Sequence, residues 1–238
     1  MFEDNIYICI LTMKVALCMR GAVSKKSGSF FCKNDLYVNS EYVNYTSCYH
    51  SILKHIIQPN PDYSIDFFCQ GWNIDLEKDI VSKYNPKKSC FEHNSKYNEE
   101  ISSLCKNERD FGGISQGFAF KRAIELKEEY EKENNMKYDI VILYRYDVLL
   151  WKDMNLKEYT GLDDTIYVNA HTDGNGDFHF VMNHENSSHF KNLIYSIPMG
   201  NEHREHYWIK NYILNYMKIN VKMDAIQPGV YQEVLRKM

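Results

Sequence analysis

Arg145 and Asp147 lie two residues apart at the end of an apolar run, within the segment KYDIVILYRYDVLLW that spans residues 137–151. The run predicts a buried central strand of an α/β sheet. A cation and a carboxylate are costly there unless they are paired or face a cleft. Ligands of open α/β sheets bind beyond the carboxyl ends of the strands, and Mg²⁺ and Mn²⁺ favour carboxylate and phosphate oxygens. The spacing therefore predicts a site for a phosphate, a metal ion or both. The structural alternative is an Arg–Asp pair that only fixes the end of the strand.

A second carboxylate, Asp177, ends the turn-rich segment HTDGNGD, residues 171–177. The segment is not an EF-hand, because no Glu occupies the twelfth position and no helix is expected before it. We expect a flexible loop that presents Asp177 just before a strand, where the carboxylate could act as a general base on an acceptor hydroxyl. The alternative is a plain turn, since Asp, Gly and Asn are common turn formers.

Two histidines offer a third candidate, because His203 and His206 are three residues apart and would share one face of a helix. His206 could be a metal ligand, although a histidine in this position is also compatible with an ordinary polar role. Two histidines alone are too few for a structural zinc site.

Further candidates lie where predicted strands end or a helix begins. Arg20 and Gly21 end the first predicted strand, where a nucleotide could lie. Trp72 follows the second strand and could stack on a base or sugar, or belong to the core. Ser115 is a plausible N-cap, so that Gln116 and the helix N-terminus could approach a ligand.

The elements that must position these residues alternate between strand and helix. Strands are predicted at 14–19, 64–69, 89–92, 140–144, 165–170 and 178–182, and helices at 41–57, 75–84, 115–134, 187–197 and 202–216. This alternation predicts an α/β fold with a mainly parallel central sheet and helices on both faces. We expect one domain over residues 13–238, preceded by a possible N-terminal extension at residues 1–12.

Composition and missing motifs exclude several classes of protein. The 238 residues carry a net charge of −4, so nucleic acid is not expected as the main partner. Acidic Glu3 and Asp4 precede the short apolar run IYICIL, which predicts neither a signal peptide nor a membrane span. The seven cysteines form no CxxC pair, which favours buried thiols in a reducing compartment and hence the cytoplasm. The GxGxxG, P-loop, GxSxG and HExxH motifs are also absent from the sequence.

The order of the predicted elements and several short motifs resemble GT-A glycosyltransferases, of the kind found in large DNA viruses and some bacteria. The resemblance runs from about Met13 to Tyr216. It is carried by KVALCMRG, SIDFFCQGWN, the Ser115 helix with KRAIELKEEYE, YDIVILYRYDVLLW and GDFHFVMN. It implies one Rossmann-like domain that binds a nucleotide-diphosphate sugar with Mn²⁺ or Mg²⁺. The family's Asp-x-Asp metal motif corresponds here to Arg145-Tyr146-Asp147, so only the second carboxylate is present.

The resemblance also implies an activity, which is transfer of a sugar from the nucleotide diphosphate to a hydroxyl of a glycan or glycoprotein. Asp147 and His206 would then hold the metal, and Asp177 would be the base of an inverting reaction. The donor would meet the strand-end candidates Arg20, Gly21, Trp72, Gln116, Arg145 and Asp147. If the chain is viral, it would act in the host cytoplasm.

Two alternatives remain open. The first is a non-catalytic nucleotide- or glycan-binding module on the same fold, which the missing first carboxylate of the metal motif favours. The second is an unrelated Rossmann-like transferase, such as a methyltransferase, which the lack of a Gly-rich first loop disfavours.

Overall fold

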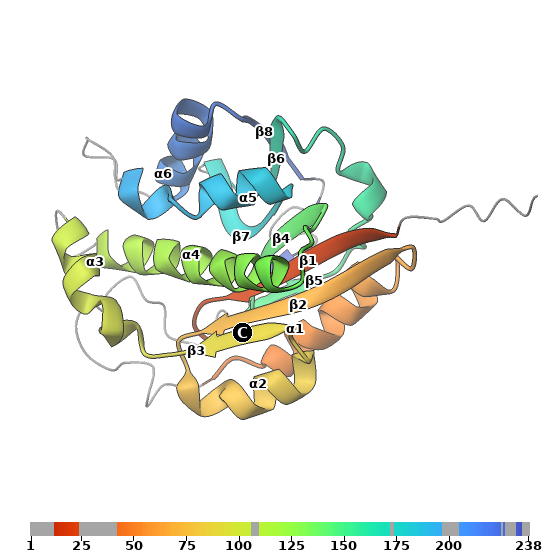
Figure 1. The fold of residues 1–238 in the computed structure, drawn as a ribbon, viewed down its shortest axis with the longest axis horizontal. Coiled ribbons are helices and arrows are strands. Elements are labelled where there is room, and N and C mark those ends of the chain that lie inside the picture. The colour runs from red at the N-terminus through yellow and green to blue at the C-terminus, as the bar shows by residue number, and fades with distance from the viewer. Residues whose placement is uncertain are drawn as a thin grey trace, which may run out of the picture.

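The computed structural model describes residues 12–23, 42–105, 110–171, 174–196, 205–224, 226 and 232–234. Seven strands of this part form one sheet in the order β3-β2-β1-β4-β7-β6-β8. The first half consists of β1 (Met13–Arg20), β2 (Tyr63–Gly71), β3 (Lys88–Phe91) and β4 (Ile140–Arg145). All of its neighbours pair in parallel, and the order 3-2-1-4 is that of a Rossmann sheet. The carboxyl ends of these four strands therefore meet at one edge (Figure 1).

The second half of the sheet introduces antiparallel pairing. Strand β7 (Gly174–Met182) runs antiparallel to β4 and to β6 (Thr165–His171), whereas β8 (Asn220–Met223) is parallel to β6. A separate two-stranded sheet joins β5 (Val148–Leu150) to β9 (Gln232–Val234). Parallel pairings outnumber antiparallel ones in the large sheet as described. The predicted mainly parallel α/β sheet is therefore confirmed.

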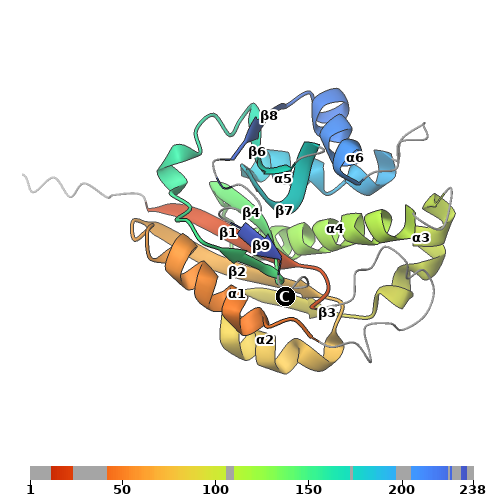
Figure 2. The ribbon, with the colours of Figure 1, turned by 180° about the vertical axis from the view of Figure 1, so that it is seen from behind.

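Helices cover both faces of the sheet, as predicted. The long helix α4 (Asp110–Glu133) lies on one side together with α5 (His184–Phe190) and α6 (Glu205–Asn211). On the other side lie α1 (Tyr45–Ile52) and α2 (Glu77–Tyr84), which Figure 2 shows from behind. The remaining helical segments are α3 (Asn98–Leu104), π-helical turns at Leu53–Ile57 and Tyr212–Met217, and 3₁₀ turns at Ile74–Leu76, Asn94–Tyr97, Leu156–Glu158 and Leu193–Ser196.

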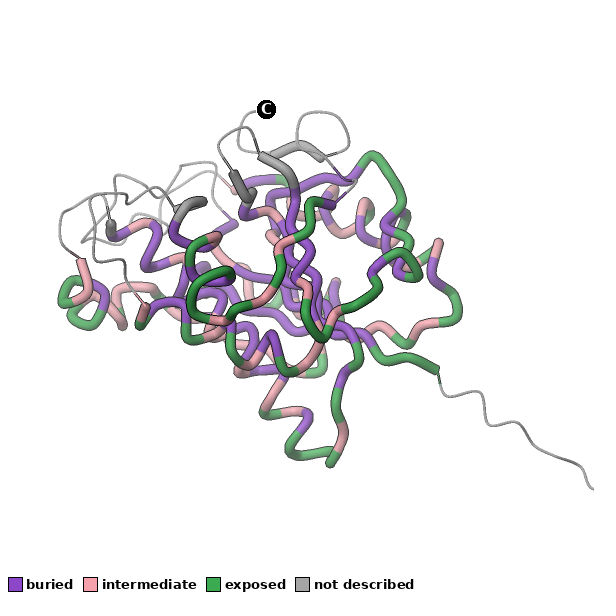
Figure 3. The backbone as a smooth tube through the Cα atoms, turned by 90° about the horizontal axis from the view of Figure 1, so that it is seen from above, coloured by how far each residue is buried: buried purple, intermediate pink, exposed green. Residues whose placement is uncertain are grey.

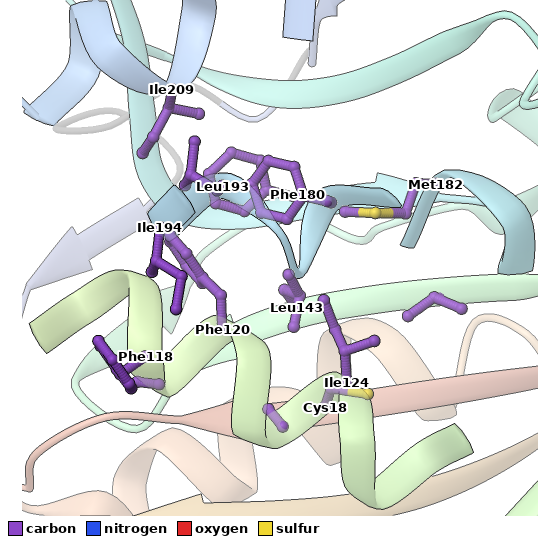
Figure 4. Packing of buried hydrophobic residues seen from close by; sticks show 14 of the residues in the cluster. Cys18, Phe118, Phe120, Ile124, Leu143, Phe180, Met182, Leu193, Ile194 and Ile209 are labelled. Atoms are coloured by element: carbon purple, nitrogen blue, oxygen red, sulfur yellow. The ribbon is translucent and has the colours of Figure 1, made fainter. Parts of the chain in front are cut away.

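Two hydrophobic cores result, one on each face, because successive strand residues point to opposite sides. Ala16 and Cys18 of β1 belong to the core beneath α4, whereas Val15, Leu17 and Met19 belong to the core beneath α1 and α2. Figure 4 shows the first core, where aromatic and aliphatic side chains of α4 meet those of β4 and β7. Buried residues follow the central strands and the inner sides of the helices (Figure 3).

Several boundaries differ from prediction. Helix α4 begins at Asp110, so Ser115 lies inside the helix and is not its N-cap. A helical glycine costs only about 1 kcal/mol. Burial of Phe111 and Ile114, each 3% exposed, offsets that cost at Gly112 and Gly113. Helix α5 begins at His184, earlier than predicted, because the Asn183 side chain accepts a hydrogen bond from the amide of Asn186 at 2.8 Å.

None of the described helices combines the length and the apolar character needed to cross a membrane.

Candidate functional site

The site is built on two arginines that end neighbouring strands. Arg20 is the last residue of β1 and Arg145 the last residue of β4, and the two are register partners in the sheet. The chain leaves β1 toward β2 on one side, while β4 lies on the other side. The order of strands reverses between β1 and β4, and ligands of such sheets bind in the crevice at this point. The two arginines, each predicted to end a strand, therefore lie side by side at this point of the sheet.

Arg145 lies between two carboxylates. Its Nε and Nη2 donate to Oδ1 and Oδ2 of Asp147, both at 2.8 Å, which is a bidentate pair. Its Nη1 donates to Oδ2 of Asp177 at 2.7 Å. The guanidinium carbon also lies 5.4 Å from the ring centroid of Phe178. The Arg145 side chain is 14% exposed and Asp147 as a whole 1%, so the pair lies away from most of the solvent.

Asp177 joins this pair to helix α4 and to β1. Gln116 of α4 donates through Nε2 to Oδ2 of Asp177, and Arg20 donates through Nη2 to the main-chain carbonyl oxygen of Asp177. Arg20 is itself buried, with its guanidinium carbon 4.0 Å from the ring centroid of Phe120. One network therefore joins residues that are up to 157 positions apart in sequence. Its members are Arg20, Gln116, Arg145, Asp147 and Asp177.

The formal charges of this network balance, with two guanidinium groups against two carboxylates. Removal of one member of a buried ion pair leaves an uncompensated charge, which is much more costly than the pair is stabilising. The arginines could bind phosphate oxygens, and a carboxylate such as Asp177 could accept a proton. The arrangement has the groups for binding an anion and moving a proton next to it.

One detail of the prediction for Asp177 is wrong. It was expected just before a strand, but it lies inside β7, which begins at Gly174 and pairs with β6 from there. Gly and Asn weaken a strand only modestly, and cross-strand pairing of Asn175 with Ala170 and of Gly174 with His171 decides the outcome. Thr172 and Asp173 lie outside the described residues.

The turn after β1 is held by two side chains that sequence reasoning missed. Gln70 at the end of β2 accepts from the amide of Gly21 at 3.0 Å, and Asn73 accepts from the amide of Val23 at 2.9 Å. Gly21 has φ of +95°, a conformation that favours glycine. Gln70 is fully buried and Asn73 almost so. The signal available in the sequence was a pair of carboxamide side chains, Gln70 and Asn73, placed where an apolar strand ends.

Trp72 lies in the core instead of lining the crevice. Its side chain belongs to the core beneath α4, the residue is 3% exposed, and its ring packs edge-on against Tyr97 with centroids 5.9 Å apart. Its backbone amide donates to the carbonyl of Gly21 at 3.4 Å. This placement corresponds to the core alternative for Trp72, because its ring is not presented to a base or sugar.

Of the two residues suggested as metal ligands, Asp147 and His206, only Asp147 has a described side chain. Both oxygens of Asp147 accept from Arg145, so this carboxylate is turned toward the arginine. His206 lies on α6, but its side chain and all of His203 are outside the described part of the chain. Over the residues that are described, no group of three or more His, Cys, Asp or Glu side chains could hold a metal ion. Asp147, the suggested ligand that the structure describes, is therefore already paired with a cationic side chain.

A buried polar chain supports β7 on the opposite face from α4. His179 Nε2 lies 2.9 Å from Oδ2 of Asp224, and the Tyr159 hydroxyl donates to the same oxygen at 2.5 Å. Burial alone would raise the pKa of Asp224, but its bonds with His179, Tyr159 and the amide of Ile226 hold that pKa below its usual value. Asp224 is therefore kept as a carboxylate two strands away from Asp177.

Comparison with known proteins gives a match in structure only. No protein-family model matches the sequence, and no curated protein matches it. A crystal structure from Desulfovibrio desulfuricans G20, provisionally assigned as a nucleotide-diphospho-sugar transferase, matches with a TM-score of 0.45 and 13% sequence identity. The match covers 89% of this chain and 79% of the other. Values this low do not establish a shared family or a shared activity.

Proposed function

We propose that this chain is a glycosyltransferase that moves a sugar from a nucleotide diphosphate to a hydroxyl group of a glycan or glycoprotein. The observation that supports it is the meeting of Arg20, Arg145, Asp147 and Asp177 where β1 and β4 end. An anion-binding pair of arginines beside a carboxylate suits a reaction with a diphosphate leaving group and a hydroxyl nucleophile. The resemblance to GT-A enzymes in several short motifs agrees with this chemistry.

In the proposed reaction, the acceptor oxygen attacks the anomeric carbon as the bond between that carbon and the diphosphate breaks. Asp177 takes the proton of the acceptor hydroxyl if the reaction inverts the anomeric centre. Arg145 and Arg20 stabilise the negative charge that develops on the leaving diphosphate, which is often the largest catalytic term. Asp147 fixes the plane of the Arg145 guanidinium through the bidentate pair.

The need for Mn²⁺ or Mg²⁺ stays a prediction of the resemblance. Because Asp147 is engaged by Arg145, we assign no step of the reaction to a metal ion. In this proposal Arg145 stands where the Asp-x-Asp motif has its first carboxylate. Its permanent positive charge supplies part of the charge that a metal cation would otherwise provide.

The pairing of Asp147 and Asp177 with Arg145 also favours the second candidate, a non-catalytic module that binds nucleotides or glycans. A site whose carboxylates are both paired with arginine could bind an anionic ligand without activating a hydroxyl. The two candidates differ in turnover. An enzyme hydrolyses its nucleotide sugar slowly in the absence of acceptor, whereas a binding module leaves it intact.

A thermal-shift screen tests binding in either case. UDP-, GDP-, dTDP- and CMP-sugars are added with and without Mn²⁺, because a ligand that binds only the native state raises the unfolding midpoint. We expect a rise with one nucleotide diphosphate sugar, and loss of that rise in Arg145→Ala. The absence of any rise would refute the transferase and a nucleotide-binding module, and would point to a glycan-binding or purely structural role. S-adenosylmethionine is screened separately. A rise with S-adenosylmethionine and with none of the sugars would favour the methyltransferase alternative.

Lys191→Ala is the matched control for the arginine variant. Lys191 also pairs with a carboxylate, Glu128, at 2.5 Å, and its side chain is 27% exposed. Glu128 lies twelve positions after Gln116 on α4, which at 1.5 Å per residue is about 18 Å from the site. The control should lower stability somewhat but keep the ligand-induced rise.

A further inference from the structure

The strand that carries Asp177 contains a bulge. Val168 of β6 pairs with Phe180 of β7, but Ala170 pairs with Asn175, so Asn169 alone lies opposite residues 176–179. A regular ladder would place equal numbers of residues on the two strands. Bulges bend a strand and change the direction of its side chains, and they are frequent beside active sites.

Asn169 holds this bulge together from the opposite strand. It is fully buried, and its Oδ1 accepts from the backbone amides of Phe178 and His179 at 3.0 and 3.3 Å. Only the oxygen of a carboxamide accepts from an N–H, so these two bonds fix the orientation of the Asn169 side chain. The two amides lie where the bulge interrupts the ladder, and buried amides require an acceptor.

The bulge decides which face of the sheet Asp177 reaches. Phe180 and Met182 of β7 lie in the core beneath α4, and Val181 lies in the core beneath α1. Regular alternation would direct Asp177 to the same face as Val181. The Asp177 carboxylate instead contacts Gln116 of α4.

The neighbouring residue His179 keeps the direction that alternation predicts. Its ring stacks on Tyr144, a member of the core beneath α1, and bonds Asp224. Asp177 and His179 both lie in the bulged stretch of β7, two residues apart, and they reach opposite faces of the sheet.

We propose that Asn169 is a positioning residue, which holds the β7 bulge and thereby turns the Asp177 carboxylate toward Arg145 and Gln116. Its catalytic meaning rests on the proposed glycosyltransferase function, but the positioning itself does not. The Asp177 carboxylate binds Arg145 and Gln116, and within the described part of the chain Asn169 makes no hydrogen bond to either of them. Asn169 therefore acts on Asp177 through the backbone of residues 178–179.

A double-mutant cycle tests the positioning without an activity assay. Unfolding by urea is measured for the native chain, Asn169→Ala, Asp177→Asn and the double variant. If Asn169 positions Asp177, the carboxylate loses its partners in Asn169→Ala, and Asp177→Asn then has a smaller effect. We expect the unfolding constants to depart from multiplicative behaviour by more than about threefold, as for residues of one network.

Asn60→Ala is the matched control for the cycle. Asn60 is also buried, and it binds three backbone groups: it donates to Ile56 and Met154 and accepts from the amide of Leu156. It precedes β2 at the opposite edge of the sheet, so its cycle with Asp177→Asn should be multiplicative. Equal behaviour of the Asn169 and Asn60 cycles would overturn the inference.

Turnover provides the second measurement. Asn169→Ala should lower kcat more than tenfold with the donor KM nearly unchanged, because donor contacts remain and the base is displaced. Asn169→Asp keeps an acceptor oxygen in place and should recover most of kcat. A purely structural role would leave kcat unchanged in the folded fraction, and that result would refute the inference for an active enzyme.

Two further outcomes are decisive. If the native chain shows no transfer but the Asn169 cycle is coupled, the proposed function fails and the positioning stands. If Asn169→Ala does not fold, Asn169→Ser replaces it in the cycle, since its shorter side chain also lacks the carboxamide oxygen. A multiplicative Asn169→Ser cycle would then overturn the inference.

Discussion

Replacement of Arg145 by Gln tests whether the arginine is the electrostatic centre of the site. The variant would leave Asp147 and Asp177, which are 1% and 6% exposed, without their shared cation. Breaking a buried ion pair by removing one partner costs about 3–5 kcal/mol. The cost for Arg145 is raised because its guanidinium pairs with two carboxylates. It is lowered because the side chain is 14% exposed, so that solvent screens part of the interaction.

We therefore expect a loss of about 3 kcal/mol in the free energy of unfolding, measured by urea denaturation at pH 7. In a chain of this size, that corresponds to a fall of about 6–12 °C in the melting temperature. The double variant Arg145→Gln with Asp147→Asn removes one charge of each sign and should recover at least about 1 kcal/mol. Strictly additive losses, or a loss below about 0.5 kcal/mol in Arg145→Gln, would refute the ion-pair account.

Three other predictions concern parts of the fold that support the site. Gly117→Ala should cost about 1–3 kcal/mol in urea unfolding, because its Cβ would lie 2.4 Å from Cγ2 of Ile194. In an Ile194→Ala background, which lacks Cγ2, the same substitution should cost less; an unchanged midpoint for Gly117→Ala in the native chain would contradict this. Burial and nearby Lys127 lower the pKa of His184 below its ordinary 6.5, so the free energy of unfolding should fall as the pH drops below about 6.5. His184→Gln should remove that part of the pH dependence. An identical pH profile of stability in the variant would contradict this prediction. Asp224 has a pKa below its ordinary 3.8, so Asp224→Asn should reduce stability at pH 7 far more than near pH 2, and equal losses at both would be inconsistent with a native carboxylate.

The parallel half of the sheet was readable from sequence because its strands are continuous apolar runs. Strands β1, β2 and β4 are buried on both faces, and their polar ends are then conspicuous. Both Arg20 and Arg145 were predicted to end a strand, but their direct pairing depends on the strand order and was not predicted. Gln116 was singled out through its place near a predicted helix start, although the helix begins earlier, at Asp110.

The remaining features depend on contacts that a local pattern does not encode. The β7 bulge arises from the register between two strands, and nothing in the residues 174–182 distinguishes a bulged strand from a loop followed by a strand. Asn169 was missed for the same reason, since one asparagine in an apolar run has no fixed meaning until its partner strand is known. The burial of Trp72 follows from its packing on Tyr97, 25 positions further along the chain.

Release of nucleoside diphosphate from UDP-, GDP- and dTDP-sugars by the native chain, with and without Mn²⁺, tests the central claim most directly. A CMP-sugar, which carries no diphosphate, is the control substrate, and Arg145→Gln is the control protein. The account predicts release from one of the three diphosphate sugars and its loss in Arg145→Gln. No release above the blank from any of them, or equal release by the variant, would contradict it.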